Sequence, residues 1–442
     1  MTSPALLDAL GRATDTKSVT VGRGTLPEAG RLIAAQLGTG PFLIVADTNT
    51  WAAAGPALLA FLAAAGCTVT DPLVFPGHPA VQASYENCLT IQTQMGDCTA
   101  IALGSGTIND LVKLASKEKG RPYAVVGTAA SMDGYTGFGA PMTEDGVKVT
   151  RPCPAPAVAI LDLDVVAQAP ASMTASGYGD LAAKIPGGAD WILADAAGVE
   201  PINGDVWAMV QGGVSSALAK PAALAAGQPD AFEGLVEGLV LSGLAMQAYG
   251  GTRPASGAEH YFSHLWELEH LGATRNPPLS HGSKVAIGSL AMCAFYEALL
   301  ARDLSTTDLT AVTSRRTPWK NIEADIRATF DGALAENAVR ETRAKYVTGN
   351  DLMQRLQPIV DNWATLSAQL RHQLVPSHEM TRMLQMAGAP CRPEDIGLTV
   401  KKVRDTFPRA MYYRSRYTAL DVAWELGIFD ELVDDVFTHL WN

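Results

Sequence analysis

The pattern of apolar residues changes near residue 170, and this change constrains the fold more than any other feature of the sequence. In the first part, short apolar runs alternate with segments of helical spacing. Strands that alternate with helices form a parallel sheet with helices on both faces. We therefore expect an α/β domain with a Rossmann-like parallel sheet over residues 1–170. Its expected strands are 42–46, 68–75, 99–103, 123–126 and 157–161, and its expected helices are 55–65, 81–96 and 108–116.

After residue 170 the strand-like runs nearly vanish. Stretches rich in Ala, Leu and Met dominate, and Pro and Gly separate or interrupt them. This pattern predicts an all-α helical domain over residues 171–442. Pro186-Gly187-Gly188 and the segment 253–257 are expected to break helices. The expected helices are 173–197, 206–219, 232–248, 260–270, 281–301 and 322–344.

Composition narrows the class of protein. The chain has 442 residues, a formal net charge of −12, 48% hydrophobic residues and 18% charged residues. This length suits two domains, each with its own core. The negative charge argues against a nucleic-acid partner, because phosphate backbones require a basic surface. A small anionic substrate, which needs only one or two local cations, remains compatible with this composition.

The sequence also predicts a soluble protein of the cytoplasm. Its six cysteines contain no C-x-x-C pair, and we interpret them as buried thiols of a reducing compartment. Asp8, Arg12 and Asp15 interrupt the N-terminus where a secretory signal would be apolar. Residues 48–70 lack charge and could span a bilayer by length, but polar and glycine residues favour a loop and an alanine-rich helix over a sheet. We expect no membrane insertion.

A glycine-rich turn, Gly104-Ser105-Gly106-Thr107, links an expected strand to an expected helix. Glycine allows close backbone approach, and the N–H groups of a helix N-terminus attract a pyrophosphate. The turn is not the G-x-G-x-x-G fingerprint, and any tight strand-to-helix turn also requires glycine. Asp47 ends an earlier strand, where a carboxylate can hold the ribose hydroxyls of NAD and repel the 2′-phosphate of NADP. The alternative is an aspartate that caps the next helix.

Four of the eight histidines, His260, His264, His270 and His281, lie within 22 residues. His260 and His264 share one helical face, whereas His270 falls on another and is expected at the surface. His281 opens the next helix after a Pro-Pro turn, which could return it towards His260. Imidazoles suit Zn, Fe, Ni and Cu alike.

Asp180, in an otherwise apolar segment after two glycines, is the best candidate for a third metal ligand. Lys184 lies one turn further on the same face. The alternative is an i,i+4 salt bridge between Asp180 and Lys184, with unconnected surface histidines. Spacing alone leaves both interpretations open.

Five ordered segments resemble those of the glycerol-1-phosphate dehydrogenases, a branch of the family that includes iron-type alcohol dehydrogenases, glycerol dehydrogenase and dehydroquinate synthase. The segments are 104–110, 128–134, 177–184, 253–260 and 281–282, and the similarity continues into 387–390 and 414–418. The resemblance implies a dehydroquinate synthase-like fold and a homo-oligomer. It also implies an NAD- or NADP-linked oxidoreductase of phospholipid biosynthesis that interconverts sn-glycerol 1-phosphate and dihydroxyacetone phosphate. One divalent metal is implied, for which zinc is preferred to nickel or iron.

The resemblance also implies roles for individual residues. Asp180, His260 and His281 match metal ligands, His264 matches a substrate contact and a candidate proton relay, and Asp133 matches a substrate-binding aspartate. The dinucleotide positions are Gly104, Ser105, Gly106, Thr107, Asp110, Thr128 and Ser131, together with Asp47. The sequence departs from the family in two places. Ser105 stands where many relatives have glycine, and Gly137 stands where they often have serine, so Gly137 is left out of the site.

A phosphorylated substrate requires cations, for which Arg253 and Lys184 are the candidates. The alternatives are an Arg253 that satisfies carbonyls at a helix end and a Lys184 in the salt bridge described above. Three other functions stay open. They are a dehydrogenase of an unphosphorylated polyol such as glycerol, a dehydroquinate synthase-like carbocycle-forming lyase, and a dinucleotide-binding sensor without catalysis.

Overall fold

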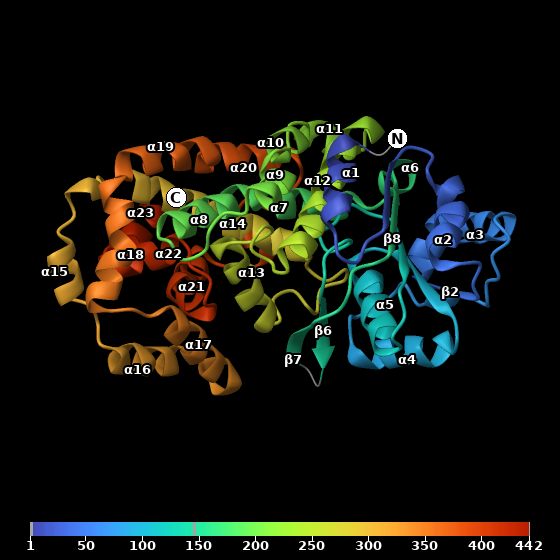
Figure 1. The fold of residues 1–442 in the computed structure, drawn as a ribbon, viewed down its shortest axis with the longest axis horizontal. Helices are drawn as coiled ribbons and strands as arrows, with labels where there is room; N and C mark the ends of the chain where they lie inside the picture. Colours follow the sequence, from blue (N-terminus) through green and yellow to red (C-terminus); the bar gives the residue numbers. More distant parts are fainter. Residues whose placement is uncertain (1–2, 145–146, 442) are drawn as a thin grey trace.

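The computed structural model describes residues 3–144 and 147–441, and Figure 1 shows an α/β part beside a helical part. The sheet of the α/β part has the strand order β1-β8-β5-β4-β2-β3, and all its pairs are parallel. This confirms the predicted fold class. The strands are β1 (Ser18–Gly22), β2 (Phe42–Asp47), β3 (Leu73–Phe75), β4 (Thr99–Gly104), β5 (Ala124–Gly127) and β8 (Val158–Asp162).

Helices cover both faces of the sheet, so the central strands are apolar apart from residues at their ends. In β2, Phe42 and Ile44 belong to the core under α2 (Ala29–Leu37) and α3 (Thr48–Ala64). The alternate residues Leu43 and Val45 belong to the other core. On that side lie α4 (Tyr85–Met95) and α5 (Gly106–Glu118), and Figure 1 shows the two helix pairs on opposite sides of the sheet. Burial on both faces explains the continuous apolar runs.

Several elements differ from the sequence prediction. The edge strand β1 and the antiparallel hairpin of β6 (Ala140–Glu144) and β7 (Val147–Arg151) were not predicted. The expected strand over 68–75 is limited to β3. The loop expected after Asp47 is wrong, because α3 begins directly at Thr48. Asp47 supports that start by accepting hydrogen bonds from the backbone N–H groups of Asn49 and Thr50.

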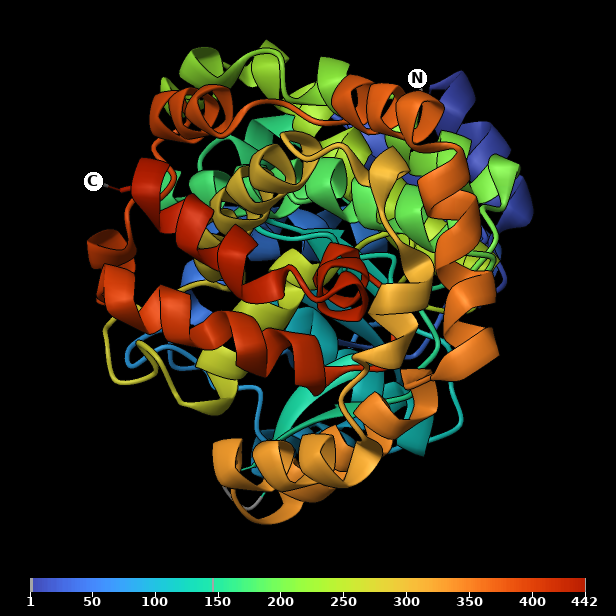
Figure 2. The ribbon, with the colours of Figure 1, turned by 90° about the vertical axis from the view of Figure 1, so that its left-hand side faces the viewer.

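The second part is helical, as predicted, and Figure 2 views its helices from that end of the molecule. The helix expected over 173–197 is broken, as predicted, but the break lies at Ala183, because α7 ends at Ala182 and α8 begins at Lys184. Pro186 is the third residue of α8, where a backbone N–H has no intrahelical acceptor to lose. The remaining elements are α1 (Pro4–Arg12), α6 (Leu163–Val166), α7 (Ala171–Ala182), α8 (Lys184–Ala196), α9 (Gly204–Gln211), α10 (Val214–Ala217), α11 (Pro221–Ala225), α12 (Pro229–Tyr249), α13 (Ala258–Leu268), α14 (His281–Leu300), α15 (Leu309–Ser314), α16 (Trp319–Thr329), α17 (Gly332–Lys345), α18 (Gly349–Asp361), α19 (Trp363–Gln373), α20 (Ser377–Met386), α21 (Val400–Tyr413), α22 (Ala419–Leu426), α23 (Phe429–His439) and the 3-10 turns η1 (Leu26–Glu28), η2 (Leu304–Thr306) and η3 (Pro393–Ile396).

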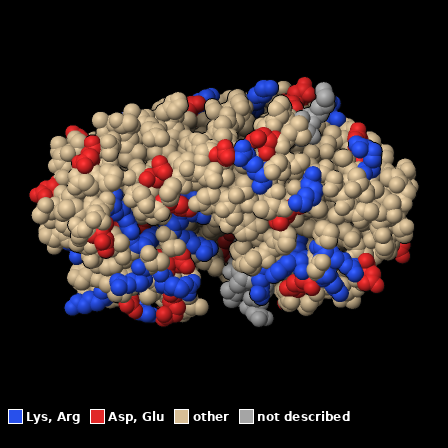
Figure 3. All heavy atoms as spheres, in the orientation of Figure 1, with Lys and Arg blue, Asp and Glu red and all other residues tan. Residues whose placement is uncertain are grey.

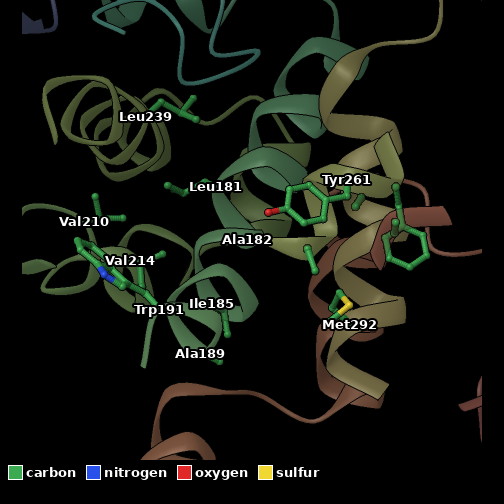
Figure 4. Packing of buried hydrophobic residues seen from close by; sticks show 14 of the residues in the cluster. Leu181, Ala182, Ile185, Ala189, Trp191, Val210, Val214, Leu239, Tyr261 and Met292 are labelled. Carbon is green, nitrogen blue, oxygen red and sulfur yellow. The ribbon is translucent and has the colours of Figure 1, made fainter. Parts of the chain in front are cut away.

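The core of the helical part surrounds α7, α8 and α14. Figure 4 shows Leu181 and Ile185 from α7 and α8 lying among side chains of the neighbouring helices, such as Leu239 of α12 and Met292 of α14. Among the described helices, α14 is long and apolar enough to cross a membrane, yet 89% of that window is buried inside the protein. Burial of this kind is what a core helix requires.

The proposed domain boundary coincides with the start of α7 at Ala171. The first helix, α1, nevertheless packs against α12 of the helical part. The domain boundary at residue 170 therefore stays a prediction, since the N-terminal helix α1 belongs by sequence to one part and contacts the other. The structure describes all six cysteines, and none forms a disulfide, in line with the predicted thiols. Figure 3 shows a hollow between the two parts on this face, with Lys and Arg side chains on both rims.

Candidate metal and nucleotide site

Three residues from distant parts of the chain converge in the helical part. Asp180 lies in α7, His260 in α13, and His281 is the first residue of α14. One donor atom from each lies within 4.8 Å of the others. The His260 Nε2 atom is 3.4 Å from Asp180 Oδ1, and the ring centroids of His260 and His281 are 5.4 Å apart. The structure thus brings together the three residues predicted as metal ligands.

Glycines make this convergence sterically feasible. A Cβ atom at Gly282 would lie 1.9 Å from the carbonyl oxygen of Ser176, and one at Gly179 would lie 2.7 Å from that of Gly282. Helices α7 and α14 therefore touch through their backbones. A Cβ atom at Gly288 would lie 2.3 Å from the carbonyl oxygen of Glu259, so α13 and α14 also cross closely. The glycines beside the candidate ligands serve close packing of the three helices that present them.

A carboxylate is hydrogen-bonded to the Nδ1 atom of each candidate imidazole ligand. His260 Nδ1 is 2.8 Å from Glu259 Oε1, and His281 Nδ1 is 2.7 Å from Glu267 Oε1. These bonds fix both ring orientations and leave the Nε2 atoms to face the site, an arrangement common around bound metals. Sequence analysis missed both glutamates. The available signal was an acidic residue on each side of His264 in an otherwise largely apolar helix.

Lys184 and Asp133 complete the cluster around Asp180. The Lys184 ammonium lies 2.8 Å from Asp133 Oδ2 and 3.2 Å from Asp180 Oδ1. The backbone N–H of Asp133 donates to Asp180 Oδ2, and Ser242 donates to Asp133. Burial alone would raise the pKa of Asp180, but Lys184 and the histidines outweigh it and lower that pKa. The i,i+4 salt bridge is therefore present, and it shares its carboxylate with the candidate metal site.

The charges of the cluster fit a divalent cation. The carboxylates of Asp133, Asp180, Glu259 and Glu267 lie together with the ammonium groups of Lys184 and Lys284. With neutral imidazoles, these six groups carry about two net negative charges, which one divalent cation would balance. Burial lowers the pKa of His260, but hydrogen bonds to Asp180 and Glu259 outweigh it and raise this pKa to about 9.

His264 lies beside this cluster, one helical turn beyond His260. Its ring stacks on that of His281, with centroids 5.8 Å apart, and lies 5.9 Å from that of His260. Burial lowers the pKa of His264 well below its ordinary value, so the ring is neutral. This position agrees with the predicted substrate contact, which stays a prediction. His270 is exposed, as predicted.

The predicted dinucleotide turn joins β4 to α5. Gly104 ends β4, Gly106 begins α5, and Ser105 Oγ is 2.6 Å from Ser131 Oγ in the loop after β5. Thr128 in the same loop donates its N–H to the Gly104 carbonyl. The loop continues to Asp133 at the candidate metal site. Thr107 lies in the first turn of α5, whereas buried Asp110 lies 3.5 Å from Lys113 and points to a structural ion pair.

Two predicted residues have other contacts. The Asp47 carboxylate caps α3, because its Oδ1 accepts hydrogen bonds from the backbone N–H groups of Asn49 and Thr50. These contacts match the alternative role, that of a helix cap. The predicted phosphate role of Arg253 is not supported. Its buried guanidinium donates to the carbonyl oxygens of Tyr417 (3.0 Å) and Asp190 (2.6 Å) and lies 3.4 Å from Glu200. It braces the segment before α13 and has no contact with the ligand cluster.

Comparisons with known proteins show what the chain is similar to. The family model described as iron-containing alcohol dehydrogenase matches residues 20–170. A glycerol-1-phosphate dehydrogenase of Halalkalibacterium halodurans is 36% identical over 257 residues, which are 58% of this chain and 64% of the relative. One from Bacillus velezensis is 35% identical over 265 residues, 59% of this chain and 67% of the relative. The chain thus spans about two thirds of these relatives.

Among solved structures, a glycerol dehydrogenase from Schizosaccharomyces pombe shares the fold. Its TM-score is 0.61 at 18% identity, over 96% of this chain and 91% of that one. The structural likeness therefore extends over nearly the whole chain, α/β and helical parts alike. By its fold, and by its identity to the curated relatives over two thirds of their length, the chain belongs to the glycerol-1-phosphate dehydrogenase family.

Proposed function

We propose that the protein is a metal-dependent, NAD(P)-linked dehydrogenase that interconverts sn-glycerol 1-phosphate and dihydroxyacetone phosphate. One observation carries the proposal. The donor atoms of Asp180, His260 and His281 lie within 4.8 Å of one another, next to the loop after β5, which also contacts the dinucleotide turn through Ser131. The names of the curated relatives supply the substrate.

Asp180, His260 and His281 would hold the metal. Three protein ligands leave positions open, as a catalytic site requires. When bound, the metal supplies Lewis acidity towards the substrate oxygen. Zinc suits one carboxylate and two imidazoles and is preferred over nickel or iron.

The other residues of the site position reactants and protons. The N-terminus of α5, with Ser105, receives the pyrophosphate of the dinucleotide. Asp133, which is fixed by Lys184 and Ser242, orients the substrate hydroxyls. His264 would relay to solvent the proton that the substrate hydroxyl loses, while the carbon atom that bears this hydroxyl gives its hydride to the nicotinamide. The Asp47 carboxylate, which caps α3 through Oδ1, would favour NAD over NADP by repelling a 2′-phosphate.

A second candidate is a dehydrogenase of an unphosphorylated polyol such as glycerol. The observation in its favour is the position of Arg253, because the expected phosphate ligand faces backbone carbonyls. We favour the phosphorylated substrate, since the relatives that share more than a third of aligned positions carry that name. We further propose that the protein forms a homo-oligomer and works in the cytoplasm. We also propose that it has no nucleic-acid partner, which the net charge of −12 supports.

The test is NADH oxidation with dihydroxyacetone phosphate by the zinc-loaded protein, followed by chiral analysis of the product. The expected product is sn-glycerol 1-phosphate. The reverse reaction is then measured with both glycerol phosphate enantiomers and with glycerol. Faster turnover of glycerol than of either phosphate would replace the first candidate by the second.

A further inference from the structure

A row of side chains leads away from the candidate metal site on the side of His264. The His264 ring lies 6.3 Å from that of Tyr413, the last residue of α21, which packs against α13. The Arg414 guanidinium carbon lies 4.7 Å from the centroid of the Tyr413 ring. Arg414 Nη2 also donates to the Tyr413 hydroxyl at 3.3 Å. The row therefore ends in a cation.

These three side chains have unused hydrogen-bonding capacity. Within the described residues, the buried Nδ1 of His264 has no partner, and no acceptor receives the proton of the Tyr413 hydroxyl. Arg414 is exposed, and no carboxylate of the part of the chain that the structure describes pairs with it. Neighbouring arginines are engaged, since Arg416 donates to Ser256 and Arg404 pairs with Asp434.

A substrate phosphate requires a cation that the ligand cluster does not offer. The buried ammonium of Lys184 already contacts two carboxylates, and one divalent metal would balance the remaining charge of the cluster. A phosphate dianion therefore needs a further positive group close to it. Arg414 is near enough to contribute to the lowered pKa of His264, although burial is its largest cause. A guanidinium offers paired donors that match phosphate oxygens.

We propose that Arg414, supported by the Tyr413 hydroxyl, binds the phosphate group of the substrate and so determines the preference for a phosphorylated polyol. The proposal rests on the proposed function and assigns to Arg414 the role that Arg253 lacks. Arg414 donates to two phosphate oxygens, and Tyr413 donates its hydroxyl proton to one of them. The phosphate thereby stays on the far side of His264 from the carboxylates.

The first experiment compares Arg414→Gln with Arg404→Gln. Arg404 lies on α21, which Arg414 directly follows; it is exposed and pairs with Asp434 outside the site, so it is a matched control. Charge-assisted bonds of about 1.5–3 kcal/mol correspond to roughly 10- to 150-fold in affinity. Arg414→Gln is expected to raise KM for dihydroxyacetone phosphate by about that factor. KM for NADH and kcat/KM for glycerol should change less than about twofold.

The result also separates the substrate phosphate from the dinucleotide phosphates. An increase confined to the KM of NADH would place the dinucleotide at Arg414 and overturn the proposal. Equal losses with dihydroxyacetone phosphate and glycerol would also overturn it. Tyr413→Phe, which keeps the ring, should raise KM for dihydroxyacetone phosphate by about threefold to tenfold.

A binding measurement keeps this inference distinct from the proposed function. Calorimetric titration of the zinc-loaded protein with inorganic phosphate requires no turnover. Phosphate should bind at least tenfold more weakly to Arg414→Gln than to Arg404→Gln, and equal affinities would refute the role of Arg414. A wild-type protein inactive on both glycerol phosphates would contradict the proposed function, whatever the titration shows.

Discussion

Replacement of Glu267 by glutamine tests how the site holds its metal. The Glu267 carboxylate lies 2.7 Å from Nδ1 of His281 and 3.8 Å from the Lys284 ammonium. Glutamine keeps the shape of the side chain and removes its charge. A neutral acceptor makes the imidazole a weaker donor to the metal, and it leaves the Lys284 ammonium without this carboxylate. Both effects oppose the binding of a cation.

The expected loss follows from the behaviour of such supporting carboxylates. Their removal weakens metal binding by about 10- to 100-fold, which corresponds to about 1.4–2.7 kcal/mol. Zinc affinity is measured by competition with a chromophoric chelator, and zinc content by mass spectrometry. Glu269→Gln is the control, because Glu269 lies two residues further on, at the end of α13, and pairs with Lys402 on the surface.

A second variant shows whether Glu267 acts by orienting the His281 ring or only by its negative charge. Glu267→Asp retains the charge but shortens the reach to His281, so it should lose part of the affinity as well. Equal zinc affinities for the wild type, Glu267→Gln and Glu269→Gln would refute the idea that Glu267 supports a ligand. Loss of folding would be visible in the melting temperature of the zinc-free protein.

Three further predictions follow from packing and burial. Gly282→Ala places a Cβ atom 1.9 Å from the Ser176 carbonyl oxygen, so we expect a lower melting temperature and at least about a hundredfold loss of kcat/KM. Gly204→Ala, with no atom within 4 Å of the new carbon, should leave both unchanged. Burial, followed by the charge of Glu259, raises the pKa of Asp190 to about 6. Protonated Asp190 therefore favours the folded state, and this stability is complete below about pH 4 and lost as the pH rises through 6. In urea unfolding between pH 4 and 7, the wild type should lose on the order of 3 kcal/mol relative to Asp190→Asn, and parallel profiles would contradict this assignment. Arg253→Ala removes two buried hydrogen bonds, and we expect a loss of about 3 kcal/mol or more in the free energy of unfolding. Its ratio of KM for phosphorylated and free substrates should equal that of the wild type, and a selective rise for the phosphate would restore the original interpretation.

The sequence predicted the layers of the fold well and the details at their edges poorly. Strands with both faces buried, such as β2 and β4, have continuous apolar runs that no polar residue interrupts. Strand β1 was missed because it lies at the sheet edge and alternates between buried and half-buried residues. Pro186 indicated a break in the helix expected over 173–197 but not its position, because proline is tolerated in the first turn of a helix and α8 begins two residues before it.

The candidate site was predictable where residue type and order carry the information. Asp180, His260 and His281 were found because an acid and two imidazoles recur in a familiar order beside glycines. Arg253 was misassigned because nearness in sequence does not show which way a guanidinium points. The spacing of residues along the sequence could not indicate Arg414. Its place beside Tyr413, on the side of His264, depends on the packing of α21 on α13.

The brace formed by Arg253 has a consequence for the order of assembly. The segment before His260 is tied to the C-terminal region by Arg253 on Tyr417, by Arg416 on Ser256, and by Asp190 on both Ala258 and Ala419. During synthesis, all three candidate ligands leave the ribosome well before residues 416–419. The nascent chain therefore possesses the ligands before it possesses their support. A chain that ends before residue 416 would keep every ligand and lack the contacts that aim one of them.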